Sequence, residues 1–185
     1  MRFLFILLFC PICSIAQSTL TDSVKLALRA ECARRMDLEQ MVEFPEFWQR
    51  ATDSMRAVRG QYLADNFRWL IAITDQYGFP VHTALSLPAD TANGAGDDRW
   101  QLFASSSLRH TFSLFPKLMT DPAVVELFRK ELQAGRLPIQ FLRSAATFYQ
   151  YGDKRCIQDR EAVNQALLSW GLEPLDSKHF YVCPE

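Results

Sequence analysis

Histidine titrates nearest neutral pH, so the three histidines of this 185-residue chain are its first candidates for acid–base chemistry. They are His82, His110 and His179, and no two of them have the HExxH spacing that places two zinc ligands on one helix face. The sequence therefore predicts no metal site, and nothing in it indicates a cofactor. His110 is the strongest of the three because it follows a segment with helical periodicity that begins near Trp100.

A catalytic site around His110 would need other polar side chains to meet it. The candidates are Asp65, Asn66 and Tyr151, and in a catalytic site all four side chains converge in one pocket within about hydrogen-bond reach. The structural alternative is that His110 lies at the C-terminal end of a helix, where the helix dipole favours a cationic side chain. Both interpretations of His110 stay open at this stage.

Three other polar groups fit structural roles better. Ser105 to Ser107 have no GxSxG turn around them, so they are expected to pack a helix or face solvent. The oxygen-bearing residues between 90 and 98 do not follow the order of a calcium-binding loop, which favours turn formation and helix capping. Aromatic and basic residues between 143 and 155 could form a ligand wall, although core packing with a solvated rim is the favoured account.

The elements that must position these residues are helices. Apolar residues recur at helical spacing, and Pro, Gly and Asp mark the ends, as in Asp121-Pro122 at the start of one segment and Gly78-x-Pro80 after another. The pattern predicts an all-α fold, with possible short extended segments in the 80–98 loop and the C-terminal tail. Helices are expected over about 20–42, 46–60, 62–77, 98–109, 121–135, 138–148 and 159–170.

The first sixteen residues, MRFLFILLFCPICSIA, have the pattern of a secretory signal peptide. Arg2 gives a positive start, an apolar run follows, and Ser14-Ile15-Ala16 offers the small-x-small cleavage pattern. The apolar run is shorter than the roughly 20 residues of a membrane-spanning helix, so no stable span is expected after cleavage. The sequence therefore predicts a signal peptide over 1–16 and one helical domain over 17–185, exported to the periplasm or the exterior.

Export affects how the cysteines are interpreted. Cys32, Cys156 and Cys183 remain after cleavage, and an oxidising compartment allows two of them to pair. A Cys156–Cys183 disulfide is favoured because it would hold the C-terminal tail. Cys32 lies on the apolar side of a helical pattern and is expected to be a buried free thiol. Which of the three pair is left open by the sequence.

Several short motifs occur in an order that resembles an uncharacterised bacterial family, domain of unknown function 6624. The resemblance spans about 60–181 and implies a helical domain, without supplying an activity, substrate or cofactor. Arg109-His110 falls where the family typically has Gln-His at a helix end. The chain departs from the family at Asp153-Lys154, where Thr-Gln is usual, and in the polar stretch before Tyr151-Gly152, which normally carries Asp-Arg and is shortened here. The matching pieces are Asp65-Asn66, Leu70-Ile71, Tyr77-Gly78-Phe79-Pro80, His110, Gly135 to Pro138, Tyr151-Gly152 and Gly171-Leu172-Pro174-Leu175.

The formal net charge of −1 shows none of the basic excess that is typical of nucleic-acid binders. The favoured function is an exported binding or interaction module of the cell envelope, with an unknown envelope or extracellular ligand. The alternative is a secreted hydrolase whose site gathers His110, Asp65, Asn66 and Tyr151. A structural role in the envelope is a third possibility, which an oligomeric apolar patch would favour.

Overall fold

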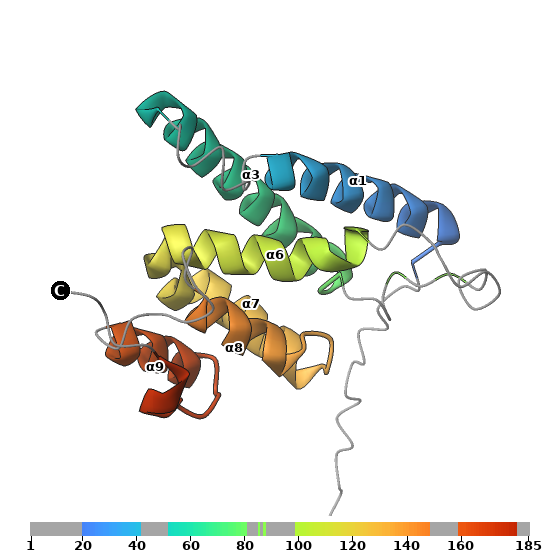
Figure 1. Cartoon of the computed structure of the whole chain (residues 1–185). Helices are drawn as coiled ribbons and strands as arrows, with labels where there is room; N and C mark the ends of the chain where they lie inside the picture. Colours follow the sequence, from blue (N-terminus) through green and yellow to red (C-terminus); the bar gives the residue numbers. More distant parts are fainter. Residues whose placement is uncertain are drawn as a thin grey trace, which may run out of the picture.

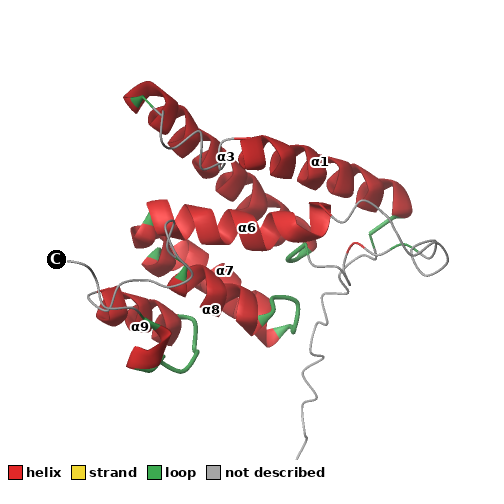
Figure 2. Ribbon diagram, viewed as in Figure 1, coloured by secondary structure: helices red, strands yellow, loops and turns green. Residues whose placement is uncertain are grey.

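The computed structural model describes residues 20–41, 52–80, 85, 87, 99–148 and 159–180. Within these ranges the chain is all-α, as predicted, with no strand (Figure 2). The helices are α1 (Asp22–Met41), α3 (Asp53–Tyr77), α6 (Arg99–Leu114), α7 (Pro122–Gln133), α8 (Ile139–Thr147) and α9 (Arg160–Ser169), with the 3₁₀ helices η1 (Pro116–Thr120) and η3 (Ser177–His179).

Some predictions concern residues outside the described ranges. These are the signal peptide over 1–16, the Cys156–Cys183 disulfide, the site residue Tyr151, and the extended pieces expected at 81–84 and after 180. None of the described helices is both long and apolar enough to cross a membrane.

Helix α6 lies at the centre of the fold. It packs against α1 and α3 on one side and against α8 on the other (Figure 1). Phe112 of α6 illustrates the packing, because its ring lies 5.7 Å from that of Phe67 on α3 and 6.3 Å from that of Phe128 on α7. The same ring stacks on Trp170, which follows α9, at 5.8 Å. Aromatic side chains from four helical segments thus meet at α6 and form the middle of the core.

Helix α3 differs from its prediction because it is one helix of 25 residues, without the expected break near Gly60. Glycine lowers helix propensity by about 1 kcal/mol relative to alanine, and packing of the buried face overrides this cost. Gly60 lies against the end of α6: a Cβ placed on it would be 3.6 Å from Leu114 Cδ2. Leu63, Phe67 and Leu70 continue the buried face of α3, and Phe67 contacts Phe112 of α6.

Helix α6 extends one turn further than predicted, to Leu114 instead of about Arg109. Thr111 and Phe112 are fully buried, so continuing the helix keeps their backbone groups hydrogen-bonded inside the core. The N–H of Phe115 donates to the carbonyl of Thr111 at 2.7 Å, and Pro116 then begins η1. His110 therefore lies inside the last part of the helix and not at its final residue.

The predicted start of α7 is confirmed. The Asp121 carboxylate accepts from the N–H groups of Ala123 and Val124 at 3.0 and 3.2 Å, and Pro122 occupies the first helical position. Gly78 is expected from the sequence in the left-handed conformation that ends many helices; its φ of 88° is positive, but its ψ of 166° lies outside that region, so it turns the chain after α3 in a more extended form.

Candidate functional site

The candidate site is organised by Glu39, a carboxylate with 0% exposed surface near the end of α1. Its position follows from the helical period, since Cys32, Met36 and Glu39 fall on one face of α1 and all three are buried. Moving an ionised carboxylate out of water costs far more than burying an uncharged side chain unless hydrogen bonds replace the water. Glu39 therefore depends on its neighbours on α3 and α6.

Three side chains supply those hydrogen bonds. His110 Nδ1 lies 2.6 Å from Glu39 Oε1, and Ser106 Oγ donates to the same oxygen at 2.8 Å. Asn66 Nδ2 donates to Oε2 at 3.2 Å. Because Ser106 and His110 lie one turn apart on α6 and Asn66 lies on α3, a single carboxylate connects three helices. We call Glu39, Asn66, Ser106 and His110 the Glu39 network.

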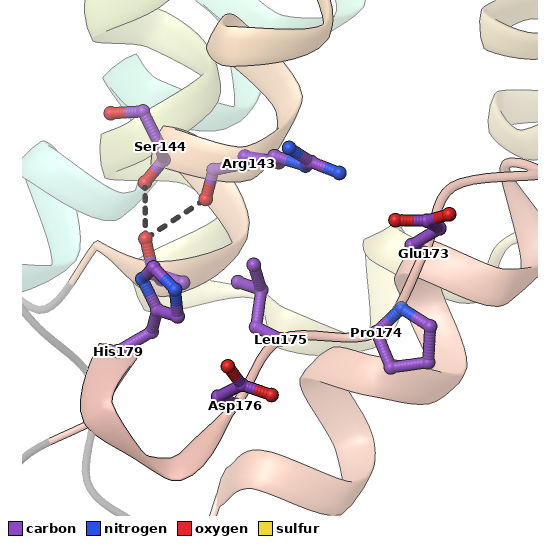
Figure 3. Close-up of a pocket in the computed structure, with 8 residues that line it drawn as sticks. Arg143, Ser144, Glu173, Pro174, Leu175, Asp176 and His179 are labelled. Atoms are coloured by element: carbon purple, nitrogen blue, oxygen red, sulfur yellow. Dashed lines mark hydrogen bonds between the residues drawn. The ribbon is translucent and has the colours of Figure 1, made fainter.

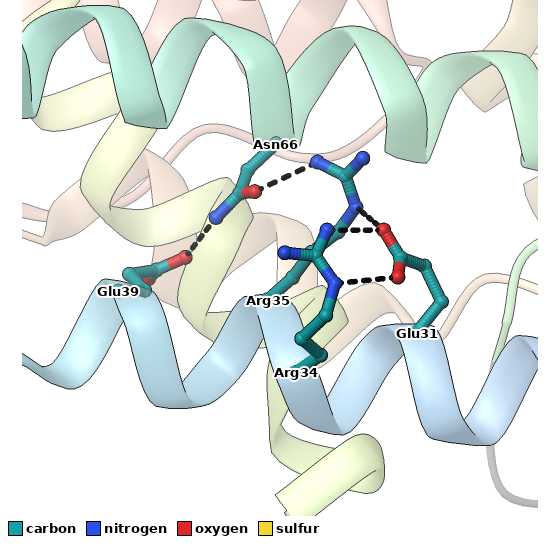
Figure 4. Close-up of polar contacts among 5 residues, drawn as sticks. All are labelled: Glu31, Arg34, Arg35, Glu39 and Asn66. Atoms are coloured by element: carbon teal, nitrogen blue, oxygen red, sulfur yellow. Dashed lines mark hydrogen bonds and ion pairs between the residues drawn. The ribbon is translucent and has the colours of Figure 1, made fainter.

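Polar contacts outside the Glu39 network hold Asn66 in place. Its Oδ1 accepts from Arg35 Nη1 at 3.0 Å, and Arg35 Nε donates to Glu31 Oε1 at 2.7 Å. Figure 4 shows this chain of contacts running between α1 and α3. Hydrogen bonding from Arg34 holds the pKa of Glu31 below its ordinary value. Since Asn66 donates to Glu39 and accepts from Arg35, its amide orientation is determined from both sides.

The Glu39 network gives the imidazole a defined role. When Nδ1 donates to a carboxylate, the lone pair that can accept a proton is on Nε2, and the carboxylate stabilises the imidazolium that forms. The His110 side chain is 13% exposed, so part of the ring reaches the surface while Glu39 does not. The ring also lies 5.2 Å from that of Phe148, which follows α8. Geometry of this kind suits a general base.

Ser106 is close to His110 but is not placed as its nucleophile. Its Oγ donates to Glu39 Oε1 and lies 3.4 Å from His110 Nδ1, the nitrogen that faces the carboxylate. A serine activated by histidine lies at the opposite nitrogen, Nε2, in the arrangement used by serine hydrolases. The expectation of a helix-packing role for Ser106 therefore agrees with its burial and its contacts.

Arg109 places a positive charge beside His110. Its guanidinium carbon lies 5.5 Å from the centre of the Phe148 ring, the same ring that His110 contacts. The Nε of Arg109 is buried and has no hydrogen-bond partner within the described parts of the chain. A cation held by an aromatic face next to a general base favours the approach of an anionic group.

The structure brings together only part of the predicted site. His110 and Asn66 meet, but through Glu39 and not directly. Asp65 lies on the exposed side of α3, where its carboxylate pairs with Arg68 one turn further on, so it points away from the Glu39 network. Tyr151 is outside the described residues.

Sequence reasoning missed Glu39 and Arg35. The signal for Glu39 was present, because it lies seven residues after Cys32 and three after Met36, on the face expected to be buried. An acidic residue at a core position requires partners, and histidine and asparagine are residue types that can supply them.

The described ranges contain no group of three or more His, Cys, Asp or Glu side chains that could hold a metal ion. Cys32 is a free, buried thiol, as predicted. Burial raises the pKa of that thiol to about 12, which makes it chemically inert at neutral pH.

Comparison with protein-family models, with curated proteins and with solved structures finds no match to this chain. The resemblance to domain of unknown function 6624 therefore stays a prediction. What the protein does has to be inferred from its own site.

Proposed function

We propose that the protein is an exported hydrolase in which His110 is the general base and Glu39 orients it. The observation that carries this proposal is the 2.6 Å contact between His110 Nδ1 and a carboxylate with no exposed surface. A buried carboxylate that faces a partly exposed imidazole is the pairing that fixes the tautomer, so that Nε2 is the nitrogen that accepts a proton.

The attacking group would be water, because Ser106 lies on the Nδ1 side of the ring. The water oxygen forms a bond to the electrophilic centre of the substrate while one of its protons passes to Nε2. Glu39 stabilises the imidazolium formed in this step. The imidazolium then returns the proton to the leaving group as the old bond breaks, which restores neutral His110.

The test uses the full chain and chromogenic para-nitrophenyl esters, phosphates and glycosides as probes. We expect turnover of at least one class, and His110→Gln should lower kcat/KM by about 10²–10⁴-fold, the usual contribution of a general base. The matched control is His179→Gln, since His179 is an exposed histidine outside the Glu39 network. Undiminished turnover by the His110→Gln variant would contradict the proposal.

A second candidate is the non-catalytic envelope-binding module expected from the sequence. It is favoured by the fact that Glu39 is inaccessible and accepts from donors on two other helices, which is also what a purely structural tie requires. If His110→Gln lowers the free energy of unfolding while no probe of any class is hydrolysed by the parent protein, this second candidate replaces the first.

Export is a proposal that rests on residues 1–16. The N-terminal residue of the protein isolated from its native cells tests it directly. Gln17 is expected at the new N-terminus after cleavage behind Ala16, and a chain that still begins at Met1 in the cytosol contradicts export.

A further inference from the structure

A cavity of about 410 Å³ lies between α8 and the segment 173–179 that follows α9. Cavities that bind small molecules occupy roughly 300–1,000 Å³, so this one has room for a ligand. Polar side chains line it from both walls, with Arg143 on α8 and Glu173, Asp176 and His179 on the other wall (Figure 3). It contains none of the residues of the Glu39 network.

The second wall is held in place by paired hydrogen bonds. Asn164 on α9 accepts from the Leu175 N–H at 2.8 Å and donates to the Leu175 carbonyl at 3.3 Å. The Leu175 side chain is buried in the core, and α9 itself packs against α8. The cavity is therefore bounded by fixed backbone on both sides, as a preformed binding site requires.

Two opposite charges face this cavity without being paired to each other. Arg143 makes no ion pair within the described ranges, and its Nε is shielded from water without a hydrogen-bond partner. Glu173 has no partner there either, whereas Asp176 pairs with Lys178 at 3.2 Å. Figure 3 shows Arg143 extending from α8 on one side of the space and the Glu173 carboxylate on the other.

We propose that this cavity binds a zwitterionic ligand of the amino-acid type, a free amino acid or a short peptide. A carboxylate suits Arg143, since guanidinium groups bind carboxylates through two parallel hydrogen bonds. An ammonium group suits Glu173, and Pro174, which also lines the cavity, offers an apolar surface for an aliphatic side chain. A ligand with only a negative charge would leave Glu173 without a partner, and a ligand with only a positive charge would leave Arg143 without one.

Isothermal titration calorimetry of the full chain with alanyl-alanine tests the proposal. Saturable binding is expected, and two analogues separate the two ends of the ligand. N-acetyl-alanyl-alanine lacks the ammonium group and alanyl-alanine amide lacks the carboxylate, so each should bind about tenfold more weakly or worse. Equal binding of all three compounds, or no binding of alanyl-alanine, overturns the proposal.

Substitutions of the lining residues test whether the ligand binds in this cavity. Arg143→Gln should abolish discrimination against the amide, and Glu173→Gln should abolish discrimination against the acetylated peptide. Arg160→Gln is the matched control, because Arg160 is an exposed arginine of α9 that does not line the cavity. Since Glu173 is exposed, Glu173→Gln keeps the test decisive even if Arg143→Gln fails to fold. If the Glu173→Gln variant binds alanyl-alanine and N-acetyl-alanyl-alanine with the same two Kd values as the parent, the binding site is elsewhere.

This inference does not depend on the proposed hydrolase. His110→Gln should bind alanyl-alanine with an unchanged Kd, because His110 does not line the cavity.

Discussion

Two glutamates are buried among the residues that the structure describes, and their surroundings are opposite. Glu131 on α7 is 1% exposed and accepts from Arg136 Nε at 2.7 Å and Nη2 at 2.5 Å. It also accepts from the backbone N–H of Phe79 at 2.9 Å, which ties the turn after α3 to α7. Glu39 is buried to the same extent, yet no arginine or lysine of the described ranges pairs with it directly.

The difference lies in what the partners can do. Arginine and a backbone N–H can only donate, so Glu131 serves only as an acceptor there, and its hydrogen bond raises the pKa of Arg136 above the ordinary value. Serine, asparagine and histidine can each both donate and accept, and histidine can also carry a proton. Glu131 thus holds two helical segments together through donors that cannot change role. Glu39 instead belongs to a hydrogen-bond network in which His110 can gain or lose a proton.

The largest expected effect comes from making Glu131 neutral. Glu131→Gln places an NH₂ group against partners that only donate, which leaves buried donors unpaired beside the Arg136 charge. We expect a loss of about 3 kcal/mol in the free energy of unfolding, measured by urea denaturation. Lys130→Gln is the control, because its ion pair with Asp75 is exposed and long at 4.0 Å, and a change within about 0.5 kcal/mol is expected.

The same substitution at Glu39 should cost less stability. A glutamine there can keep its oxygen toward Asn66 if the Ser106 hydroxyl rotates and His110 changes tautomer to accept from the new NH₂ group, so Glu39→Gln is expected to lose about 1 kcal/mol. Under the proposed hydrolase it should also lower kcat/KM by about 10²-fold or more, because glutamine does not stabilise an imidazolium. A destabilisation equal to that of Glu131→Gln would show that the partners of Glu39 are as fixed as those of Glu131.

A smaller effect is expected at the outer end of the contacts that support Asn66. The lowered pKa of Glu31, caused by Arg34, contributes stability above the pKa of the unfolded chain and loses it as pH falls through the folded value. Because the pair is largely exposed, Glu31→Gln should cost only about 0.5 kcal/mol at pH 7. The difference from the parent should shrink on acidification below the ordinary glutamate range, and a pH-independent difference would argue against this ion pair.

The smallest effect is expected at Cys32, whose reactivity should be the same in the Glu39→Gln variant as in the parent. With its pKa raised to about 12, only about one thiol in ten thousand is ionised at pH 8, so iodoacetamide should not label it in the folded parent. Cys32 shares the buried face of α1 with Glu39, and it therefore reports whether that helix stays packed. Mass spectrometry of the Cys32 peptide should show no labelling in Glu39→Gln and full labelling in guanidinium chloride.

The helices could be predicted from the sequence because apolar spacing and capping residues are local signals. Gly60 was misjudged because its effect depends on contact with Leu114, which is far away in the sequence. Within the site, the Asp65-Asn66 pair was identified, but the helical phase decides which of the two is buried. Asn66 shares its face with Leu63 and Leu70, whereas Asp65 does not.

Glu39 was missed for a different reason. It belongs to a stretch of five charged residues between 31 and 39, and such a stretch normally indicates a solvent-facing helix surface. The spacing from Cys32 and Met36 places Glu39 on the buried face, but only the pairing of α1 with α6 identifies the side chains that it meets there, and that pairing is a long-range property. The histidine could thus be predicted from its type, but its partner could not.

The central position of α6 determines how the molecule can open. Because α1, α3 and α8 all pack on this helix, its backbone amides reach solvent only when several of those helices separate together. Hydrogen exchange within α6 should therefore follow the global unfolding reaction, while the outer turns of α1 and α9 exchange through local fraying. His110 would then be held by the most slowly opening part of the protein, and its partner Glu39 by a helix that can move first.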